Sequence, residues 1–173
     1  MSAFNNLPTQ ITINGAECEI NTDFRTVLTF LAMWEDEEIP TQYKYALMAD
    51  MFGVNSPSEV WKWLNEGEVA NVEHTAKIID FQEDEKYIYS AFMQDYGIDL
   101  YEIPYLHWYK FKYLLEGLSD NTRLKQIMSI RATDTSQIKD SNEKERMRKL
   151  QNMYKLRDKE AERLLAEMEK EGW

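Results

Sequence analysis

The chain has 173 residues and a formal net charge of −11. This length suits one ordinary domain and excludes a large multidomain enzyme. Hydrophobic residues make up 43% of the chain, and glycine and proline are sparse, which excludes a disordered or fibrous protein. Acidic side chains outnumber basic ones by 31 to 20, which argues against a nucleic-acid partner, because its phosphates need cationic contacts.

The expected cellular compartment follows from cysteine usage and hydropathy. The one cysteine, Cys18, cannot form an intramolecular disulfide, and no Cys/His spacing suits a structural zinc site. Residues 1–10 lack the basic start and apolar run of a secretion signal, and no stretch approaches the roughly 18 apolar residues that span a membrane. We therefore expect a protein of a reducing cytoplasm, with no membrane partner.

The N-terminal part of the sequence predicts one β-hairpin. Polar and apolar side chains alternate over residues 10–13 and again over 16–20. Asn14-Gly15 between them is typical of a two-residue hairpin turn, because both central positions of that turn need positive φ.

Two helices are expected between Asn21 and Gly53. Asn21 is expected to cap the first, which ends at the acidic run 35–38. Pro40 suits the start of the second, and Gly53 suits a left-handed C-cap. The apolar face of the first helix is predicted at Phe24, Val27, Leu28, Leu31 and Trp34. The apolar face of the second is predicted at Tyr43, Ala46, Leu47 and Met51.

Two further helices are expected before Gly97. Residues 56–59 form a capping-box pattern with proline at the first helical position, and Gly67 is expected to stop that helix. Asp80 is expected to cap the next one, which Gly97 ends. Their apolar positions are Val60, Trp61 and Leu64 in one helix and Ile88, Ala91 and Phe92 in the other.

Three more helices are expected in the second half of the chain. Pro104 suits the start of a fifth helix, and a sixth covers residues 122–130. Residues 141–171 contain no glycine or proline, which predicts one long terminal helix. The apolar face of the fifth helix is predicted at Trp108, Phe111, Leu115 and Leu118.

These elements together predict a mainly α fold. Residues 1–140 are expected to form a compact helical domain whose N-terminal hairpin covers about residues 10–20. Residues 141–173 are expected to form an extended C-terminal helix.

Charge is unevenly distributed along the chain. Residues 1–104 carry 5 basic and 19 acidic side chains, whereas residues 105–157 carry 12 basic and 6 acidic ones. The basic part could dock on the acidic part of the same chain or of a neighbouring copy, and both alternatives stay open.

The sequence contains no recognisable catalytic or metal-binding motif. The two histidines, His74 and His107, lack the spacing of metal ligands or of a nucleophile and its base. No glycine-rich phosphate loop or calcium loop occurs either. We expect no catalytic residue, no metal ligand and no cofactor, and we interpret the acidic run 35–38 as a solvated turn rather than a cation site.

The segment that begins at His107 is interpreted as a structural core motif. Its members are His107, Trp108, Phe111 and Leu115. His107 could be a titrating switch or a hydrogen-bonded residue at the edge of the core, and we favour the second because no catalytic partner is visible. Apolar residues at helical spacing are more often core than a ligand groove.

The predicted C-terminal helix has a narrow apolar seam. Its members are Met147, Leu150, Tyr154, Ala161, Leu164 and Met168, with Arg157 in the same register. Such a seam buries a helix poorly within its own domain, so a solvent-exposed extension and a partner-binding helix are both compatible with it. For a partner-binding helix, the predicted contacts are Leu150, Tyr154, Leu164 and Met168.

The middle of the chain resembles a known family. The residues that carry the resemblance are Tyr87 to Leu100, Leu106 to Phe111, Leu114 to Leu118, Ile130-Arg131 and Ile138 to Asp140. They are similar to the bacteriophage "gene product fifteen" family over roughly residues 22–156. Relatives usually have two adjacent tryptophans after the histidine, where this chain has Trp108-Tyr109.

The resemblance implies a role in phage tail morphogenesis. The family comes from siphophages and prophages of Gram-positive bacteria, where its genes lie beside those for the tail tube and the tape-measure protein. This position implies a non-enzymatic tail-assembly chaperone that binds the helical tape-measure protein in the host cytoplasm. A structural tail or connector component retained in the virion is the alternative. The partner would be the tape-measure protein or another helical tail protein, and a homo-oligomer stays open.

Overall fold

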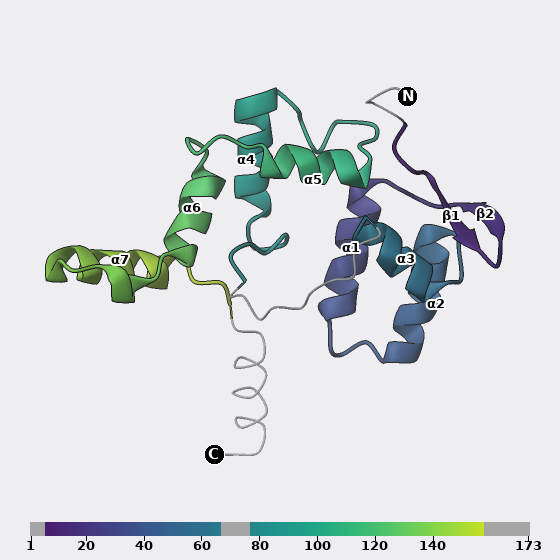
Figure 1. Ribbon diagram of the computed structural model, residues 1–173, viewed down its shortest axis with the longest axis horizontal. Coiled ribbons are helices and arrows are strands. Elements are labelled where there is room, and N and C mark those ends of the chain that lie inside the picture. The colour runs from purple at the N-terminus through teal and green to yellow at the C-terminus, as the bar shows by residue number, and fades with distance from the viewer. Residues whose placement is uncertain (1–5, 67–76, 158–173) are drawn as a thin grey trace, which may run out of the picture. The chain divides into compact units, whose positions relative to one another are not determined.

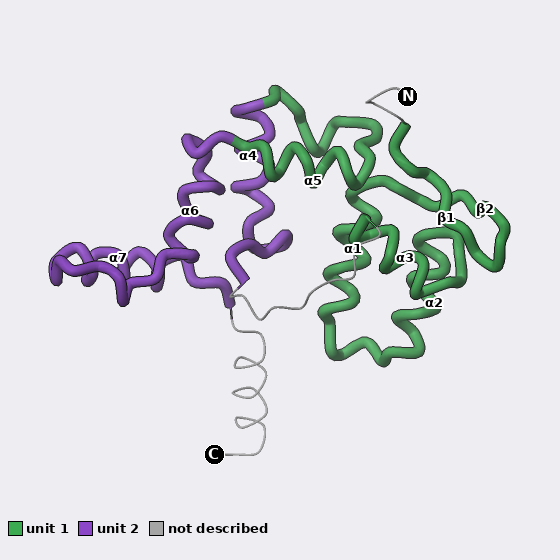
Figure 2. Tube along the Cα trace, viewed as in Figure 1, with its two compact units in different colours: residues 1–74, 96–118 green, residues 75–95, 119–173 purple. Residues whose placement is uncertain are grey.

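The computed structural model describes residues 6–66 and 77–157 (Figure 1). Within these residues the chain forms helices α1 to α7, a short 3₁₀ helix η1 and one β-hairpin, so the predicted mainly α class is confirmed. The chain divides into two compact units (Figure 2). Unit 1 comprises residues 1–74 and 96–118, and unit 2 comprises residues 75–95 and 119–173. The division after residue 140 that the sequence suggests stays a prediction.

The predicted hairpin and its turn are confirmed. Strands β1 (Gln10–Ile13) and β2 (Ala16–Glu19) pair antiparallel, with Ile11 opposite Cys18. Asn14 and Gly15 have φ of 51° and 84°, as a two-residue turn of this type requires. Ile11 is buried where β1 packs against helix α3 of unit 1.

In its described residues, unit 1 packs four helices around an aromatic core. These helices are α1 (Phe24–Glu35), α2 (Thr41–Phe52), α3 (Pro57–Leu64) and α5 (Trp108–Glu116). Helix α1 packs against both α2 and α5, and α2 packs against α3. The Phe30 ring contacts those of Trp34, Phe52 and Trp61. The Phe24 ring stacks on Phe111 with 4.8 Å between centroids, which joins α1 to α5.

Two predicted helix starts in unit 1 are wrong for one physical reason. The N-cap of α1 is Asp23, whose carboxylate accepts the backbone N–H of Arg25 at 2.9 Å. The predicted cap, Asn21, instead accepts the backbone N–H of Asp23, which precedes the helix. Helix α5 begins at Trp108 rather than at Pro104. Residues 22–24 and 106–108 form an isolated antiparallel bridge, with N···O distances of 3.0 and 2.8 Å. This pairing needs extended backbone, so neither helix can begin earlier.

The ends of α2 and α3 are predicted in part. Gly53 has φ of 75° and caps α2 in the left-handed conformation, which is confirmed. Pro57 occupies the first turn of α3, but the Ser56 side chain accepts no capping hydrogen bond, so the predicted capping box does not form. Helix α3 ends at Leu64, and Gly67 lies outside the described residues.

The apolar face predicted for α2 is wrong. The buried residues of this helix are Lys44, Met48 and Phe52, whereas Tyr43, Ala46 and Leu47 are exposed. Lys44 lies on the inner face because its ammonium donates to the Trp34 carbonyl at 2.6 Å, near the C-terminal end of α1. Three of the four residues of the predicted apolar face therefore point away from the core of unit 1, and Met48 and Phe52 point into it.

Unit 2 contains α6 (Arg123–Ala132), η1 (Thr135–Gln137), α7 (Ser141–Met153) and α4 (Glu85–Tyr96) except for its last residue. Helix α7 packs against α6 and η1. Thr122 caps α6 with its hydroxyl, close to the predicted start. The predicted apolar positions of α4 are buried, as are two residues of α6: Ile88, Ala91, Phe92, Leu124 and Ile127.

Two predicted boundaries in unit 2 are wrong. The Asp80 carboxylate accepts the backbone N–H groups of Gln82 and Glu83, so it caps a turn that precedes α4 rather than α4 itself. The terminal helix expected to run to residue 171 ends at Met153, Tyr154 is its C-cap, and residues 155–157 are not helical. The Tyr154 carbonyl accepts a side-chain N–H from Arg131. Gly97, with φ of 64°, follows the last residue of α4 as predicted.

Candidate functional site

His107 fixes the start of α5 in unit 1 and is 3% exposed. Its Nδ1 accepts the backbone N–H of Tyr109 at 3.1 Å, so the proton of the neutral ring lies on Nε2. Nε2 lies 3.1 Å from the Pro8 carbonyl oxygen and donates to it. Burial lowers the pKa of His107, and Lys110 lowers it further, against the opposing effect of the Pro8 hydrogen bond. The histidine is therefore a neutral helix cap.

Side chains from α5 reach the last carbonyls of α3. The Tyr109 hydroxyl donates to the Trp63 carbonyl, and the Trp108 indole N–H donates to the Leu64 carbonyl at 3.3 Å. The Lys112 ammonium donates to the same Leu64 oxygen. Carbonyls at the end of a helix lack helical N–H partners and favour a nearby cation, so these donors join α5 firmly to α3.

The tyrosines around this contact are held protonated. Burial, together with the nearby Glu66 carboxylate, raises the pKa of Tyr109. The hydrogen bond from Tyr113 to Glu66, 2.6 Å long, raises the pKa of Tyr113 to about 12. Lys112 pairs with the same carboxylate at 2.6 Å. A protonated phenol donates a hydrogen bond, so the Tyr109 and Tyr113 hydroxyls hold α5 to the end of α3 and to Glu66.

The predicted core motif lies within this arrangement. Its buried members are His107, Trp108 and Phe111, whereas Leu115 is half-buried. Tyr109, which the sequence analysis did not place in the motif, stacks on Trp63 with 5.2 Å between ring centroids.

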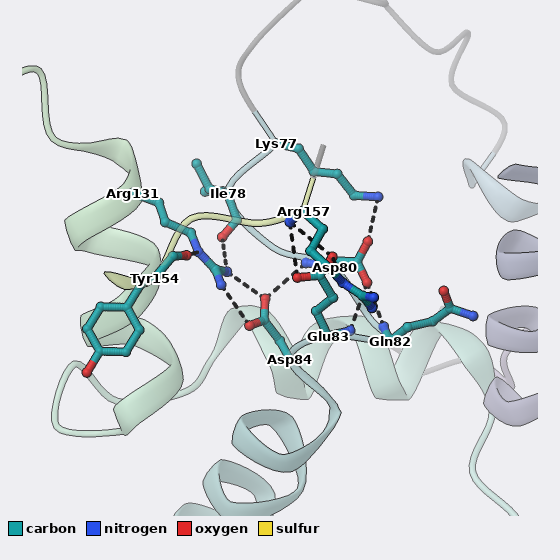
Figure 3. A network of polar contacts seen from close by, with 9 residues as sticks. All are labelled: Lys77, Ile78, Asp80, Gln82, Glu83, Asp84, Arg131, Tyr154 and Arg157. Carbon is teal, nitrogen blue, oxygen red and sulfur yellow. Dashed lines mark hydrogen bonds and ion pairs between the residues drawn. The ribbon is translucent and has the colours of Figure 1, made fainter. Parts of the chain in front are cut away.

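A second polar network lies within unit 2 (Figure 3). Arg131 and Asp84 form a two-point ion pair with N···O distances of 2.6 and 3.0 Å, and the Asp84 side chain is only 1% exposed. The guanidinium also donates to the carbonyls of Ile78 and Tyr154. The Oδ2 atom of Asp84, which also accepts from Arg131, accepts the backbone N–H of Asp80 at 3.0 Å. The ion pair therefore joins three segments of unit 2, and no sequence motif predicted it.

Two acidic residues near this ion pair, Asp80 and Glu83, bind backbone N–H groups and cations of neighbouring segments in unit 2. Burial opposes ionisation of Asp80, but the Glu83 N–H, Lys77 at 3.0 Å and the Gln82 N–H outweigh it and lower its pKa to about 2. Glu83 in turn accepts the backbone N–H of Arg157 at 3.2 Å (Figure 3). Each carboxylate thus has cationic or amide partners, as a structural network requires.

The four predicted partner contacts are only partly described. Leu150 is half-buried in α7. Tyr154 follows the helix, and its hydroxyl bonds to Arg123 while its carbonyl bonds to Arg131. Leu164 and Met168 lie outside the described residues. The role of these four residues in partner binding stays a prediction.

The exposed face of α2 is the largest departure from the sequence analysis. Tyr43 is 58% exposed and Leu47 is 40% exposed, and Ala46 lies beside them at helical spacing. The helical spacing of these residues identifies them as one side of the helix. Spacing alone does not predict whether that side packs against another element. We refer to Tyr43, Ala46, Leu47 and Asp50 as the α2 face.

The described residues contain neither a metal-ligand cluster nor a membrane-spanning helix. No group of three or more His, Cys, Asp or Glu side chains in that part of the chain could hold a metal ion. No helix among those residues combines the length and apolarity needed to cross a membrane. Each buried side-chain N or O atom there has a hydrogen-bond partner.

Comparison with known proteins gives one family. No curated protein and no solved structure shows significant similarity to the chain. The model of the family described as "Bacteriophage Gp15 protein" matches residues 4–72 and 53–156, which is most of the chain. These matches include His107, Trp108 and Phe111 as well as Asp84 and Arg131. The chain therefore belongs to the bacteriophage Gp15 protein family, which indicates a phage structural or morphogenesis protein.

Proposed function

We propose that this protein is a non-enzymatic tail-assembly chaperone that binds the helical tape-measure protein in the host cytoplasm during tail morphogenesis. Family membership supports a phage morphogenesis role. The observation that carries the proposal is the apolar part of the α2 face, a stripe that comprises Tyr43, Ala46 and Leu47 and that a folded unit leaves exposed. A chaperone for a long helical client needs such a stripe, because it covers apolar client surface until assembly.

The polar networks also favour binding over catalysis. In both units the buried histidine, arginine and carboxylate groups are engaged with backbone amides or with each other. Groups used in this way position helices, and none has the nucleophile-and-base geometry of a catalytic pair.

Co-expression tests the proposal. The tagged protein should capture the tape-measure protein encoded with it and should increase the soluble fraction of that client. An unrelated helical protein of similar length serves as the control and should stay in the flow-through. Failure to capture the tape-measure protein would contradict the proposal.

Analysis of purified phage particles separates the chaperone from a virion component. A chaperone is displaced during assembly, so mass spectrometry of particles should not detect it. Its presence at a fixed copy number per particle would instead assign it as a structural tail or connector component.

A further inference from the structure

We propose that the α2 face is the docking surface for one amphipathic helix whose apolar stripe is bordered by lysine and arginine. This inference rests on the proposed function, since it names the surface and the chemistry that would recognise the client. The argument depends on three observations within unit 1: the spacing of the exposed residues, their rigid support and the charges around them.

The spacing of the α2 face suits helix-on-helix packing. Tyr43, Ala46, Leu47 and Asp50 lie at positions i, i+3, i+4 and i+7 of one helix. This is the pattern of anchors by which one helix lies along another. Ala46 has the smallest side chain of the four, so a partner helix can approach α2 most closely at this position. The 12 residues of α2 span about 18 Å, which is enough for about three turns of a partner helix.

The α2 face is supported by a rigid helix. On its opposite side Met48 and Phe52 are almost fully buried, and Phe52 meets the ring of Phe30 edge-on at 5.1 Å. Tyr45 packs against Trp34 with 5.5 Å between ring centroids, and Lys44 ties α2 to the end of α1. A surface that is already ordered loses little conformational entropy when a partner binds.

The charges around the α2 face favour a basic partner. Residues 35–38, which are all acidic and exposed, lead into the N-terminal end of α2. Asp50 lies on the face itself, within the last turn of α2. The one basic residue of α2, Lys44, is buried and directed at the Trp34 carbonyl. An apolar stripe between acidic ends complements a stripe with basic borders and repels an acidic one.

A binding assay with a synthetic peptide tests the chemistry directly. The probe is a labelled, blocked helical peptide of about 18 residues with leucines at i, i+3, i+4 and i+7, bordered by lysines. Fluorescence polarisation measures its Kd for the full-length protein. We expect the substitutions Tyr43→Asp and Leu47→Asp, made together, to weaken binding about thirtyfold, as loss of a central anchor does.

Matched controls separate docking from folding. Tyr101 is 62% exposed in the same unit, so Tyr101→Asp should bind the peptide as the wild type does. Tyr43→Phe should retain binding, because it keeps the ring. A peptide with glutamate borders should bind the wild type more weakly than the lysine peptide, and Glu38→Lys with Asp50→Lys should reverse that preference. Circular dichroism checks that every variant is folded.

Several results would overturn the docking proposal. These are no binding of the lysine peptide by the wild type, equal binding by the Tyr43→Asp/Leu47→Asp variant, or a preference for the glutamate peptide. A wild-type dimer that this variant converts to a monomer in sedimentation would also overturn it, because a second copy would then occupy the face.

The same variants applied to the tape-measure protein distinguish the two proposals. If the wild type and the double variant capture that client equally, the proposed function stands and the docking surface is wrong. If the wild type fails to capture it while the peptide results hold, the docking surface stands and the tape-measure client is wrong.

Discussion

The two units satisfy buried backbone carbonyls by different means. In unit 1, the neutral donors of Trp108 and Tyr109 reach the carbonyls at the end of α3. In unit 2, the Arg131 guanidinium reaches the carbonyls of Ile78 and Tyr154, and Asp84 balances its charge. The acceptors are of the same kind in both units. In unit 1 the buried aromatic side chains donate, with the Lys112 ammonium sharing the Leu64 carbonyl, whereas in unit 2 the donor is a largely buried guanidinium.

This difference determines how each unit should respond to damage. An aromatic donor adds a large apolar surface to its hydrogen bond, so its loss leaves a cavity. A buried ion pair adds little net stability over an apolar core. Loss of one partner, however, leaves the other charge buried without compensation, which destabilises the fold. We therefore expect unit 1 to depend on packing volume and unit 2 to depend on the completeness of its pair.

The largest effect is expected from Trp108→Ala in unit 1. Removing this buried ring, which stacks on Phe111 and donates to Leu64, should lower the free energy of unfolding by about 4 kcal/mol. Trp108→Phe should lose less, because most of the packing volume remains. Urea denaturation followed by circular dichroism measures both. An unchanged midpoint for Trp108→Ala would contradict the dependence of unit 1 on packing.

A slightly smaller effect is expected from Arg131→Met in unit 2. Asp84 would then remain buried without its cation, and the loss should be about 3 kcal/mol. Adding Asp84→Leu should recover part of this loss, since no buried charge remains, although the Asp80 N–H would still lack its acceptor. Hydrogen exchange of unit 2 peptides measures the change. If the double variant is no more stable than Arg131→Met, the pair does not act as one group.

Acid should act on unit 2 through Asp80. Its pKa is near 2 in the folded protein and 3.8 in the reference state, so the carboxylate stabilises the fold at pH above 3.8. About 2 kcal/mol should be lost as the pH falls from 3.8 towards 2. Asp80→Asn should remove this dependence. The difference between the two pH titrations isolates Asp80, and identical titrations would contradict the assignment.

Unit 1 should respond to acid at a higher pH through His107. Its pKa in the folded protein lies below the usual 6.5, so stability is full above pH 6.5 and falls as the pH drops below it. His107→Asn keeps an acceptor for the Tyr109 N–H but loses the Pro8 contact, which should lower stability by about 1.5 kcal/mol. The variant should lose the pH dependence near 6.5. Tryptophan fluorescence, which Trp63 and Trp108 make sensitive to unit 1, measures it.

How much could be predicted from the sequence depended on whether the determining contacts were local. The hairpin, the left-handed Gly53 and the cap of α6 were foreseen, because a turn or cap is fixed by adjacent residues. The starts of α1 and α5 were not foreseen, because they depend on backbone pairing between residues about eighty positions apart.

The candidate site was harder to predict than the fold. Asp84 and Arg131 are 47 positions apart, and neither stands in a motif that indicates the other. The apolar residues of the α2 face were recognised from their helical spacing and were then assigned to the core. Helical spacing shows that one side of a helix is apolar, but it does not show whether that side faces the core or the solvent. No signal within α2 itself could have corrected this assignment, because the contact that directs Lys44 inward is made to the Trp34 carbonyl of another helix.

The smallest effect is expected from Gly15→Val in the β-hairpin of unit 1, which takes no part in the hydrogen bonds between α5 and the end of α3. Gly15 has φ of 84°, and a β-branched side chain there is strained even though a Cβ would meet no atom within 4 Å. The hairpin can relax, so the loss should be no more than about 1 kcal/mol. Gly15→Asn should lose less, because asparagine tolerates this conformation. Thermal unfolding measures both variants. A loss as large as that of Trp108→Ala would show that unit 1 depends on the hairpin as much as on its aromatic donors, and would remove the contrast drawn between the two units.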